Sequence, residues 1–206
     1  MLIYESHFSN PMSLCDFSKN GEGHVYIEED KLYLDDTRYG KGLTCWLKKE
    51  FSGNIEISFD ACAVEPEFAS NINFFFAAKP IKGQPADLLT FSGSYAQYHE
   101  KAQMYIVTMT GDFENIHGKS NIGYSRLRKD PKFVLLSETY DIKTRLNKLY
   151  QFNIKKTDKD ISVKINNKLI HHYEDEGIYE SGLLGFRTYY TKLWIDHFTV
   201  KRIPTL

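Results

Sequence analysis

The sequence predicts an all-β fold, a two-sheet antiparallel jelly-roll sandwich with little helix. Apolar and polar residues alternate with a period of two in many separate stretches, as expected for antiparallel strands with one buried face. The 3.6-residue periodicity of amphipathic helices is scarce. Short polar connections separate the alternating stretches, and their uneven spacing favours a sandwich over a closed barrel.

The first expected element is a hairpin of residues 24–28 and 31–34, which turns at Glu29 and Asp30. The clearest alternation follows at 55–61, where Ile, Ile, Phe and Ala alternate with Glu, Ser and Asp. Such a pattern indicates a strand with one polar face. Further strands are expected at 43–48, 70–78, 103–110, 132–137, 183–189 and 192–201.

A three-strand meander is expected over residues 150–173. Its strands are 150–155, 161–165 and 169–173, and the first two alternate cleanly between apolar and polar side chains. The polar connections at 157–160 and 166–168 have the length of hairpin turns.

Three stretches lack clean periodicity: 79–100, 111–126 and the turn around 138–146. In a sandwich we expect them to be surface loops, and loops longer than about 12 residues are often functional. The aromatic and glycine residues of 92–99 argue that this part is ordered.

Length and composition fit one folded domain over residues 1–206. Aromatic residues make up 15% of the chain, far above the level of disordered chains. Lys plus Arg total 26 and Asp plus Glu 27, a net charge of -1, so neither nucleic acid nor an anionic membrane is an expected partner. Nothing in the sequence indicates the oligomeric state.

The N-terminal residues lack the basic and apolar regions of a signal peptide, and no apolar run reaches the roughly 18 residues of a membrane span. Cys15, Cys45 and Cys62 are an odd, widely spaced set, which fits a reducing compartment. A cytoplasmic location is therefore expected. A chain whose signal peptide had been removed would begin in the same way and would be exported.

Common catalytic motifs for nucleotide, zinc or serine-hydrolase chemistry are missing from the sequence. A retaining sandwich glycosidase needs two carboxylates about 5–5.5 Å apart. The nearest candidates, Glu56 and Asp60, are four residues apart on a strand, which separates them by about 13 Å. This pair therefore does not predict a glycosidase.

The first candidate cluster is Tyr95, Tyr98, His99 and Glu100, just before the strand that carries Tyr105. A histidine that titrates near neutrality beside tyrosines and a carboxylate suits acid–base chemistry. The alternative is that the tyrosines anchor the loop and His99 is a structural histidine.

A second cluster consists of Arg126, Arg128 and Lys129. Arg126 and Arg128 share a strand face by alternation, and their guanidinium groups suit bidentate binding of a carboxylate or sulfate. A solvated basic edge that discourages strand pairing is the alternative.

The third cluster lies in 184–190, where Leu184 and Phe186 face the core while Arg187 and Tyr189 face the other way. An exposed Arg and Tyr suit an acidic sugar. The candidates to join them are Trp46, Asn73 and Phe75, because aromatic rings stack on sugars and Asn binds hydroxyls. Single exposed aromatic residues also occur without any function.

Two metal-site candidates are weaker. His171 and His172 are adjacent on a strand and point to opposite faces, so they do not share an ion. Asp196, in the last strand, could bind a hard cation or could accept a hydrogen bond from a nearby loop.

Several of these segments together resemble the YesU-like family, an uncharacterised branch of the concanavalin A-like lectin/glucanase superfamily. The resemblance covers roughly residues 24–200, and Gly93-x-Tyr95-x-x-Tyr98-His99 is its most specific part. The other matching segments are Thr44-Cys45-Trp46, Phe51-x-Gly53-x-Ile55, Phe74 through Ala78, Leu127-Arg128-Lys129 with Phe133, Gly185-Phe186-Arg187 and Asp196-x-Phe198.

The resemblance implies two antiparallel sheets, one of them concave, and a role in degrading pectin-like or other uronate-containing polysaccharides. It also implies a structural calcium ion at Asp196. The superfamily's glucanase acid motif is not found here, in agreement with the carboxylate spacing above.

Elimination on an acidic oligosaccharide, by a lyase or dehydratase, is the leading hypothesis. His99 would abstract the proton at C5, Tyr98 or Tyr105 would protonate the leaving oxygen, and no cofactor is required. The expected substrate-binding residues are Arg128, Arg187, Trp46, Asn73, Phe75, Tyr95, Tyr189 and Lys129.

The main alternative is a non-catalytic carbohydrate-binding domain that holds its ligand through Trp46, Tyr105, Arg187 and Tyr189. A hydrolase that uses His99 and Glu100 is a third possibility, without supporting spacing.

Overall fold

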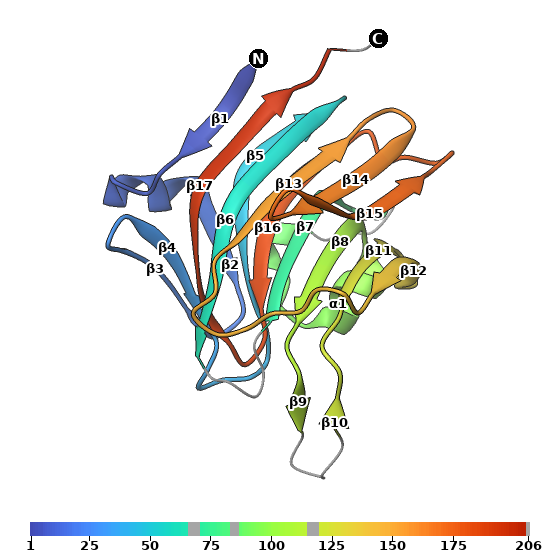
Figure 1. The fold of residues 1–206 in the computed structure, drawn as a ribbon. Helices are drawn as coiled ribbons and strands as arrows, with labels where there is room; N and C mark the ends of the chain where they lie inside the picture. Colours follow the sequence, from blue (N-terminus) through green and yellow to red (C-terminus); the bar gives the residue numbers. More distant parts are fainter. Residues whose placement is uncertain (66–70, 83–86, 115–119, 205–206) are drawn as a thin grey trace.

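The computed structural model describes residues 1–65, 71–82, 87–114 and 120–204, whose two large antiparallel sheets pack face to face (Figure 1). Sheet A has the order β15 (Lys168–Glu174), β14 (Asp160–Ile165), β13 (Tyr150–Lys156), β6 (Ile55–Glu65), β17 (Lys192–Arg202), β4 (Lys31–Asp35) and β3 (His24–Glu28), and β1 (Leu2–Ser6) also pairs with β17. Sheet B has the order β12 (Val134–Thr139), β11 (Ser125–Asp130), β8 (Ala102–Thr110), β7 (Asn71–Pro80), β16 (Ser181–Thr188), β5 (Leu43–Ser52) and β2 (Phe17–Asn20).

The predicted two-sheet sandwich is confirmed, and each predicted strand overlaps a strand of the structure, although position 70 of the expected strand 70–78 lies outside the described residues. The hairpin of β3 and β4 pairs Glu28 with Lys31. Its turn residues Glu29 and Asp30 both have positive φ, which matches the twist of a two-residue hairpin. The β13–β14–β15 meander is present in the expected order.

Alternation fails where a strand is buried on both faces. Nearly all of β7 and β8 is buried, because one face of sheet B packs on sheet A and the other is covered by the chain before β8. That covering chain contains η3 (Leu88–Thr90) and α1 (Tyr95–Lys101). The expectation of a surface loop over 79–100 is therefore wrong for this part, while 83–86 lie outside the described residues.

Helix α1 has a simple local origin. Tyr95, Tyr98 and Ala102 recur at intervals of three or four residues, which places them on one side of a helix. Gln97 Oε1 accepts a hydrogen bond from the Ser92 backbone at 2.7 Å and closes the preceding turn. Seven residues are two turns, too few for a periodic signal to stand out in the sequence.

Five further strands were not among those expected: β1, β2, β11 and the short hairpin strands β9 (Phe113–Glu114) and β10 (Ser120–Asn121). The hairpin projects from one end of the sandwich (Figure 1). It lies within the stretch 111–126 that we expected to be a loop, as do the first two residues of β11. Residues 115–119 of that stretch lie outside the described residues. η1 (Pro11–Asp16) connects β1 and β2.

The main core lies between the sheets and is rich in aromatic rings. Phe59 on β6 stacks on Phe152 of β13 with ring centroids 4.8 Å apart, and Phe186 of β16 meets it edge-on at 5.1 Å. Complete burial of a Phe side chain contributes about 1.5–3 kcal/mol, so this group anchors the two layers.

A second apolar cluster covers the outer face of sheet B, the face turned away from sheet A. Trp46, Phe75 and Ile106 of the sheet pack beneath Phe91 and Tyr98 of the covering segment. The candidate site lies beside this cluster, so the covering segment fixes its shape. No helix in the described part of the chain is long and apolar enough to span a membrane.

Candidate functional site

A row of polar side chains crosses the outer face of sheet B from β11 to β2. The strand register pairs its members with one another in turn, so all six belong to one row. They are Arg126, Thr108, Asn73, Arg187, Thr44 and Asn20. The neighbouring row is mostly apolar and is the one that η3 and α1 cover.

Arg187 is the centre of the row. Its side chain is only 2% exposed, yet Nε has no hydrogen-bond partner among the described residues. Nη2 donates to the Gly93 carbonyl at 3.3 Å. Burial lowers the pKa of Arg187, although the nearby tyrosines and Asp36 act to raise it. A buried guanidinium with an unused donor is costly, since an unsatisfied charged group loses hydration without compensation.

Asp36 supplies negative charge near Arg187. Its carboxylate is fully buried, and Oδ2 accepts hydrogen bonds from the backbone of Gly42 at 2.9 Å and of Tyr190 at 3.1 Å. Oδ1 has no partner within the described residues. Within the described residues, the buried polar atoms of the site without a hydrogen-bond partner are therefore Arg187 Nε, Asp36 Oδ1 and the hydroxyl oxygens of Thr44 and Thr108.

Tyr95 of α1 lies between Arg187 and His99. The guanidinium carbon of Arg187 is 4.1 Å from the centre of the Tyr95 ring. The centroids of the Tyr95 and His99 rings are 4.5 Å apart. Burial raises the pKa of Tyr95, while Arg187 and the Thr108 hydroxyl oppose that shift. Tyr95 therefore keeps its proton at neutral pH and can donate it in a hydrogen bond.

His99 is held by a carboxylate that sequence reasoning missed. Its Nδ1 lies 2.7 Å from Oδ2 of Asp130, whose side chain is completely buried at the end of β11. Asp130 Oδ1 accepts from the Phe133 backbone at 2.7 Å, and the Phe133 ring lies 3.9 Å from the His99 ring. The carboxylate and the ring fix the orientation of the imidazole.

Arg126 and Arg128 share the outer face of β11, as predicted. Arg126 forms an ion pair with Glu138, and its guanidinium lies over the Tyr124 ring. Arg128 lies 3.9 Å over the Phe133 ring. Burial lowers the pKa of Arg128, as does the neighbouring Arg126. Arg126, Arg128 and Arg187 thus all belong to one face of sheet B, and Phe133 connects Arg128 to His99.

Tyr105 and Lys129 do not belong to this face. Tyr105 packs in the core between the sheets, where its hydroxyl donates to Asp175 at 2.5 Å. Lys129 binds the same Asp175 carboxylate at 2.7 Å. Because strand residues alternate between faces, Tyr105 and Lys129 point away from His99, so the structure does not support their expected roles there.

Three other predicted residues are on the correct face but are covered. Trp46 and Phe75 are fully buried beneath α1, so neither ring is free to stack on a sugar. The Tyr98 hydroxyl donates to Asn20 Oδ1 at 2.9 Å, and Trp46 Nε1 donates to the same oxygen at 2.6 Å. These contacts make Tyr98 a structural residue rather than an acid beside His99.

Asn73 and Tyr189 complete the predicted set. Asn73 is buried and donates to Asn71 and to the Arg187 carbonyl, so it supports the strand that carries Arg187. Tyr189 is 44% exposed and follows Arg187 on the same side of the chain. Its ring packs edge-on against Tyr190, and Tyr189 lies near enough to Arg187 to interact with its charge.

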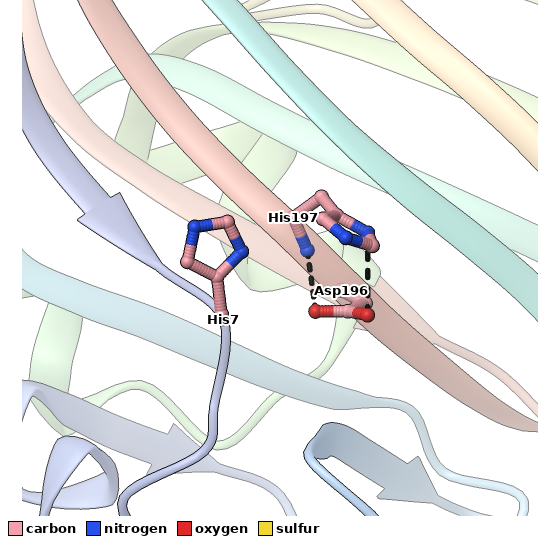
Figure 2. A group of neighbouring side chains, drawn as sticks. All are labelled: His7, Asp196 and His197. Carbon is pink, nitrogen blue, oxygen red and sulfur yellow. Dashed lines mark hydrogen bonds and ion pairs between the residues drawn. The ribbon is translucent and has the colours of Figure 1, made fainter.

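Asp196 lies far from this site, on the outer face of sheet A, beside His197 and His7 (Figure 2). Calcium takes six to eight oxygen ligands. Two of the three ligand groups in this cluster are imidazoles, and Asp196 Oδ1 already accepts from the His197 backbone at 2.6 Å. The donor set does not fit the calcium ion that the superfamily resemblance implies.

His171 and His172 point to opposite faces, as expected, with His171 buried between Ser125 and Ser137.

Sequence reasoning missed three residues of the site: Asp130, Asp36 and Asn20. Asp130 follows Arg126 and Arg128 at the same two-residue spacing, so the alternation that joined the two arginines extends to it. Asp36 and Asn20 had no such signal, because both reach the site through long-range strand pairing and turns.

Residues 37–198 match the family described as a domain of unknown function, DUF6250. The chain belongs to the DUF6250 family. No curated protein matches it. The sequence resemblance to the YesU-like branch remains a prediction, since the DUF6250 match and the lectin-like fold support only the broader grouping.

Solved structures share the fold of this DUF6250 domain at low sequence identity. A protein of unknown function with a galectin-like fold from Bacillus subtilis superimposes with a TM-score of 0.82 at 19% identity, covering 98% of this chain and 96% of that one. The carbohydrate binding module CBM66 from Bacillus subtilis has a TM-score of 0.59 at 11% identity, covering 90% and 95%. The carbohydrate recognition domain of Emp46p, in its potassium-bound form, has a TM-score of 0.69 at 10% identity and covers 98% of each chain.

Proposed function

We propose that this DUF6250 domain binds an acidic carbohydrate at the edge of the outer face of sheet B, with Arg187 binding the carboxylate. The main observation behind this proposal is that Nε of the buried Arg187 guanidinium has no hydrogen-bond partner among the described residues. Buried polar groups in proteins nearly always have partners, and a free one commonly indicates a missing water or ligand. A carboxylate is the geometric match for the guanidinium group.

The surroundings of Arg187 support a sugar rather than a bare anion. Tyr189 offers an exposed ring, Tyr95 a hydroxyl and ring edge, and Asp36 an unused acceptor for a sugar hydroxyl. The fold is also that of proteins named for carbohydrate binding or recognition.

The binding test uses isothermal titration of the full chain with a galacturonate trimer and with the uncharged galactose trimer. We expect measurable affinity for the acidic trimer and at least about tenfold weaker binding of the neutral one, because a charge-assisted hydrogen bond contributes about 1.5–3 kcal/mol. Arg187→Gln and Tyr189→Ala should each weaken binding of the acidic trimer. Tyr26→Ala is the matched control, since Tyr26 stacks on Tyr33 in sheet A, away from the site.

Equal affinity for both trimers, or unchanged affinity in both site variants, would contradict the assignment to Arg187. Tyr189→Ala keeps this test decisive if Arg187→Gln fails to fold, because Tyr189 is exposed and contributes little to the core.

Elimination is a second candidate function, favoured by the pairing of His99 with a buried carboxylate. Asp130 on Nδ1 would hold His99 with Nε2 free to accept a proton. In this scheme Nε2 takes the C5 proton, the C–H electron pair forms the C4–C5 double bond, and the C4–O bond breaks. The leaving oxygen then takes a proton from Tyr95, the tyrosine that lies against His99.

This scheme predicts rising ultraviolet absorbance from an unsaturated uronate when the chain is incubated with acidic oligosaccharides. The signal should be lost in His99→Ala while binding of the same sugar persists. Binding without any such signal from the unmodified chain would leave only the binding function.

A further inference from the structure

A cluster of potential metal ligands lies on the outer face of sheet A, opposite the carbohydrate site. Asp196 and His197 belong to β17, and His7 belongs to the chain that leaves β1, which runs beside β17 (Figure 2). One ligand atom from each of the three residues lies within 4.8 Å of the other two. Both histidines are exposed, so solvent reaches the cluster.

An irregularity in β17 creates this cluster. The pairing of β17 with β6 shifts between Asp196 and Thr199, and His197 has a φ of 49°. Ile195 and Phe198 are both fully buried, whereas Asp196 and His197 between them both face outward. Regular alternation would have turned His197 into the core. The bulge therefore places two adjacent ligand-type side chains on one face, and bulges often redirect side chains at functional sites.

Each histidine also has a carboxylate on one of its ring nitrogens. His197 Nδ1 lies 3.1 Å from Asp60 Oδ2 and 3.2 Å from Asp196 Oδ2, and His7 Nε2 lies 3.1 Å from Glu5 Oε1. In each ring the other nitrogen has no carboxylate contact among the described residues. To bind an ion together with Asp196, His197 would use Nε2 or would exchange its Nδ1 contact with Asp196 for the ion. Histidines that bind metals in proteins commonly have their other nitrogen bonded to a carboxylate in this way.

We infer that His7, Asp196 and His197 bind one divalent transition-metal ion of the zinc class. Two imidazoles and one carboxylate are the donors that zinc and its neighbours prefer, and they form one of the usual three-residue sets of zinc sites. Ligand atoms about 2.0–2.1 Å from a tetrahedral ion are roughly 3.4 Å apart. The exposed rings therefore need to move by no more than roughly 1.5 Å to close on the ion.

Because both histidines are exposed, water could supply a fourth ligand. A polar hollow over β6 and β13 begins at His197 and includes Ser58, Asp60, Gln151 and Asn153. A bound ion would also join the end of β1 to β17, in addition to the backbone pairing of the two strands.

The test is titration of the chelator-treated full chain with Zn²⁺ alone, followed by calorimetry and thermal unfolding. We expect one ion per chain, and a rise in Tm of about 5–10 °C when free Zn²⁺ is a hundredfold above Kd. Ca²⁺ should give no such rise. Co²⁺ in place of Zn²⁺ should give the visible absorption bands of a four-coordinate nitrogen and oxygen site.

The variants His7→Gln and His197→Gln should each weaken Zn²⁺ binding at least about tenfold. His172→Gln is the matched control, because His172 is an exposed histidine of sheet A that pairs with Asp160 outside the cluster. Zn²⁺ binding that is unchanged in both cluster variants, an absence of binding below about 100 μM, or stabilisation by Ca²⁺ that is independent of both histidines would each overturn the assignment. His7→Gln keeps the test decisive if the bulge variant fails to fold.

Discussion

His99 Nδ1 lies 2.7 Å from Oδ2 of the fully buried Asp130, across the gap between helix α1 and the end of β11. This contact fixes the helix that covers sheet B to the strand that carries Arg126 and Arg128. Because Tyr95 lies one turn before His99 and packs on Arg187, the same contact sets the position of the ring in the candidate site.

Asp130→Asn should lower the free energy of unfolding by about 1–3 kcal/mol, because it weakens a buried charge-assisted hydrogen bond without changing the size of the side chain. Chemical denaturation measures the change. The control is His172→Gln, which breaks an exposed histidine–aspartate pair and should cost less than about 1 kcal/mol. Equal losses in the two variants would mean that the His99–Asp130 contact does not stabilise the covering helix.

Gly42 lies directly against Arg187, and its φ is 93°. A Cβ at this position would collide with the guanidinium and approach the Gly93 carbonyl. Gly42→Ala should therefore displace Arg187, weaken binding of an acidic trimer and destabilise the fold.

Gly53→Ala is the matched control for this change. Gly53 also has a positive φ, 72°, but a Cβ there meets no atom within 4 Å. It should cost only the backbone strain, about 1–2 kcal/mol, and leave sugar binding unchanged. Denaturation and titration of both variants separate the two effects, and a Gly42→Ala variant that binds normally would show that Arg187 has no part in binding.

Tyr105 and Lys129 should affect stability and not sugar binding. Burial pushes the pKa of Asp175 up, but the hydrogen bonds from Lys129 and Tyr105 outweigh it and hold the pKa below its usual value. Lys129→Met and Tyr105→Phe each remove one partner of that carboxylate. We expect a loss of about 1–3 kcal/mol from each variant, with the affinity for an acidic trimer unchanged within twofold. A large loss of affinity in either variant would mean that the substituted residue contributes to sugar binding.

The sandwich could be predicted because most strands have one face in the core and one in solvent. In β13 and β14 apolar residues that face the core alternate with polar residues that face solvent. The turn at Asn166 and Asn167, both with positive φ, separates β14 from β15. β1 and β2 are short strands at the sheet edges, where few positions are buried, so they lacked a comparable signal.

The site was only partly predictable for a related reason. Strand β8 is buried on both sides from Met104 to Met109, so its sequence does not show that Tyr105 points away from His99. Helix α1 hides Trp46 and Phe75, which an uncovered sheet would have exposed. The alternation put Arg126 with Arg128 and turned Arg187 away from Phe186, but it did not show that their strands share a sheet or that His99 lies beside them, because both depend on long-range pairing.

His171 predicts a pH dependence of stability. Burial lowers the pKa of His171 to about 4, whereas an unfolded histidine has a pKa near 6.5. Between these values the unfolded chain binds a proton that the folded chain does not, so the stabilising contribution is complete above pH 6.5 and is lost as the pH falls toward 4. The loss from this residue amounts to about 3 kcal/mol.

Denaturation at a series of pH values between 4 and 7 measures this loss. Carboxylates also titrate in this range. The informative quantity is therefore the difference in the free energy of unfolding between the unmodified chain and His171→Gln. We expect that difference to favour the unmodified chain at pH 7 and to shrink by about 3 kcal/mol toward pH 4. His172→Gln, at the neighbouring exposed histidine, is the control for the substitution itself. A constant difference for His171→Gln would mean that His171 is protonated in the folded chain, between Ser125 and Ser137.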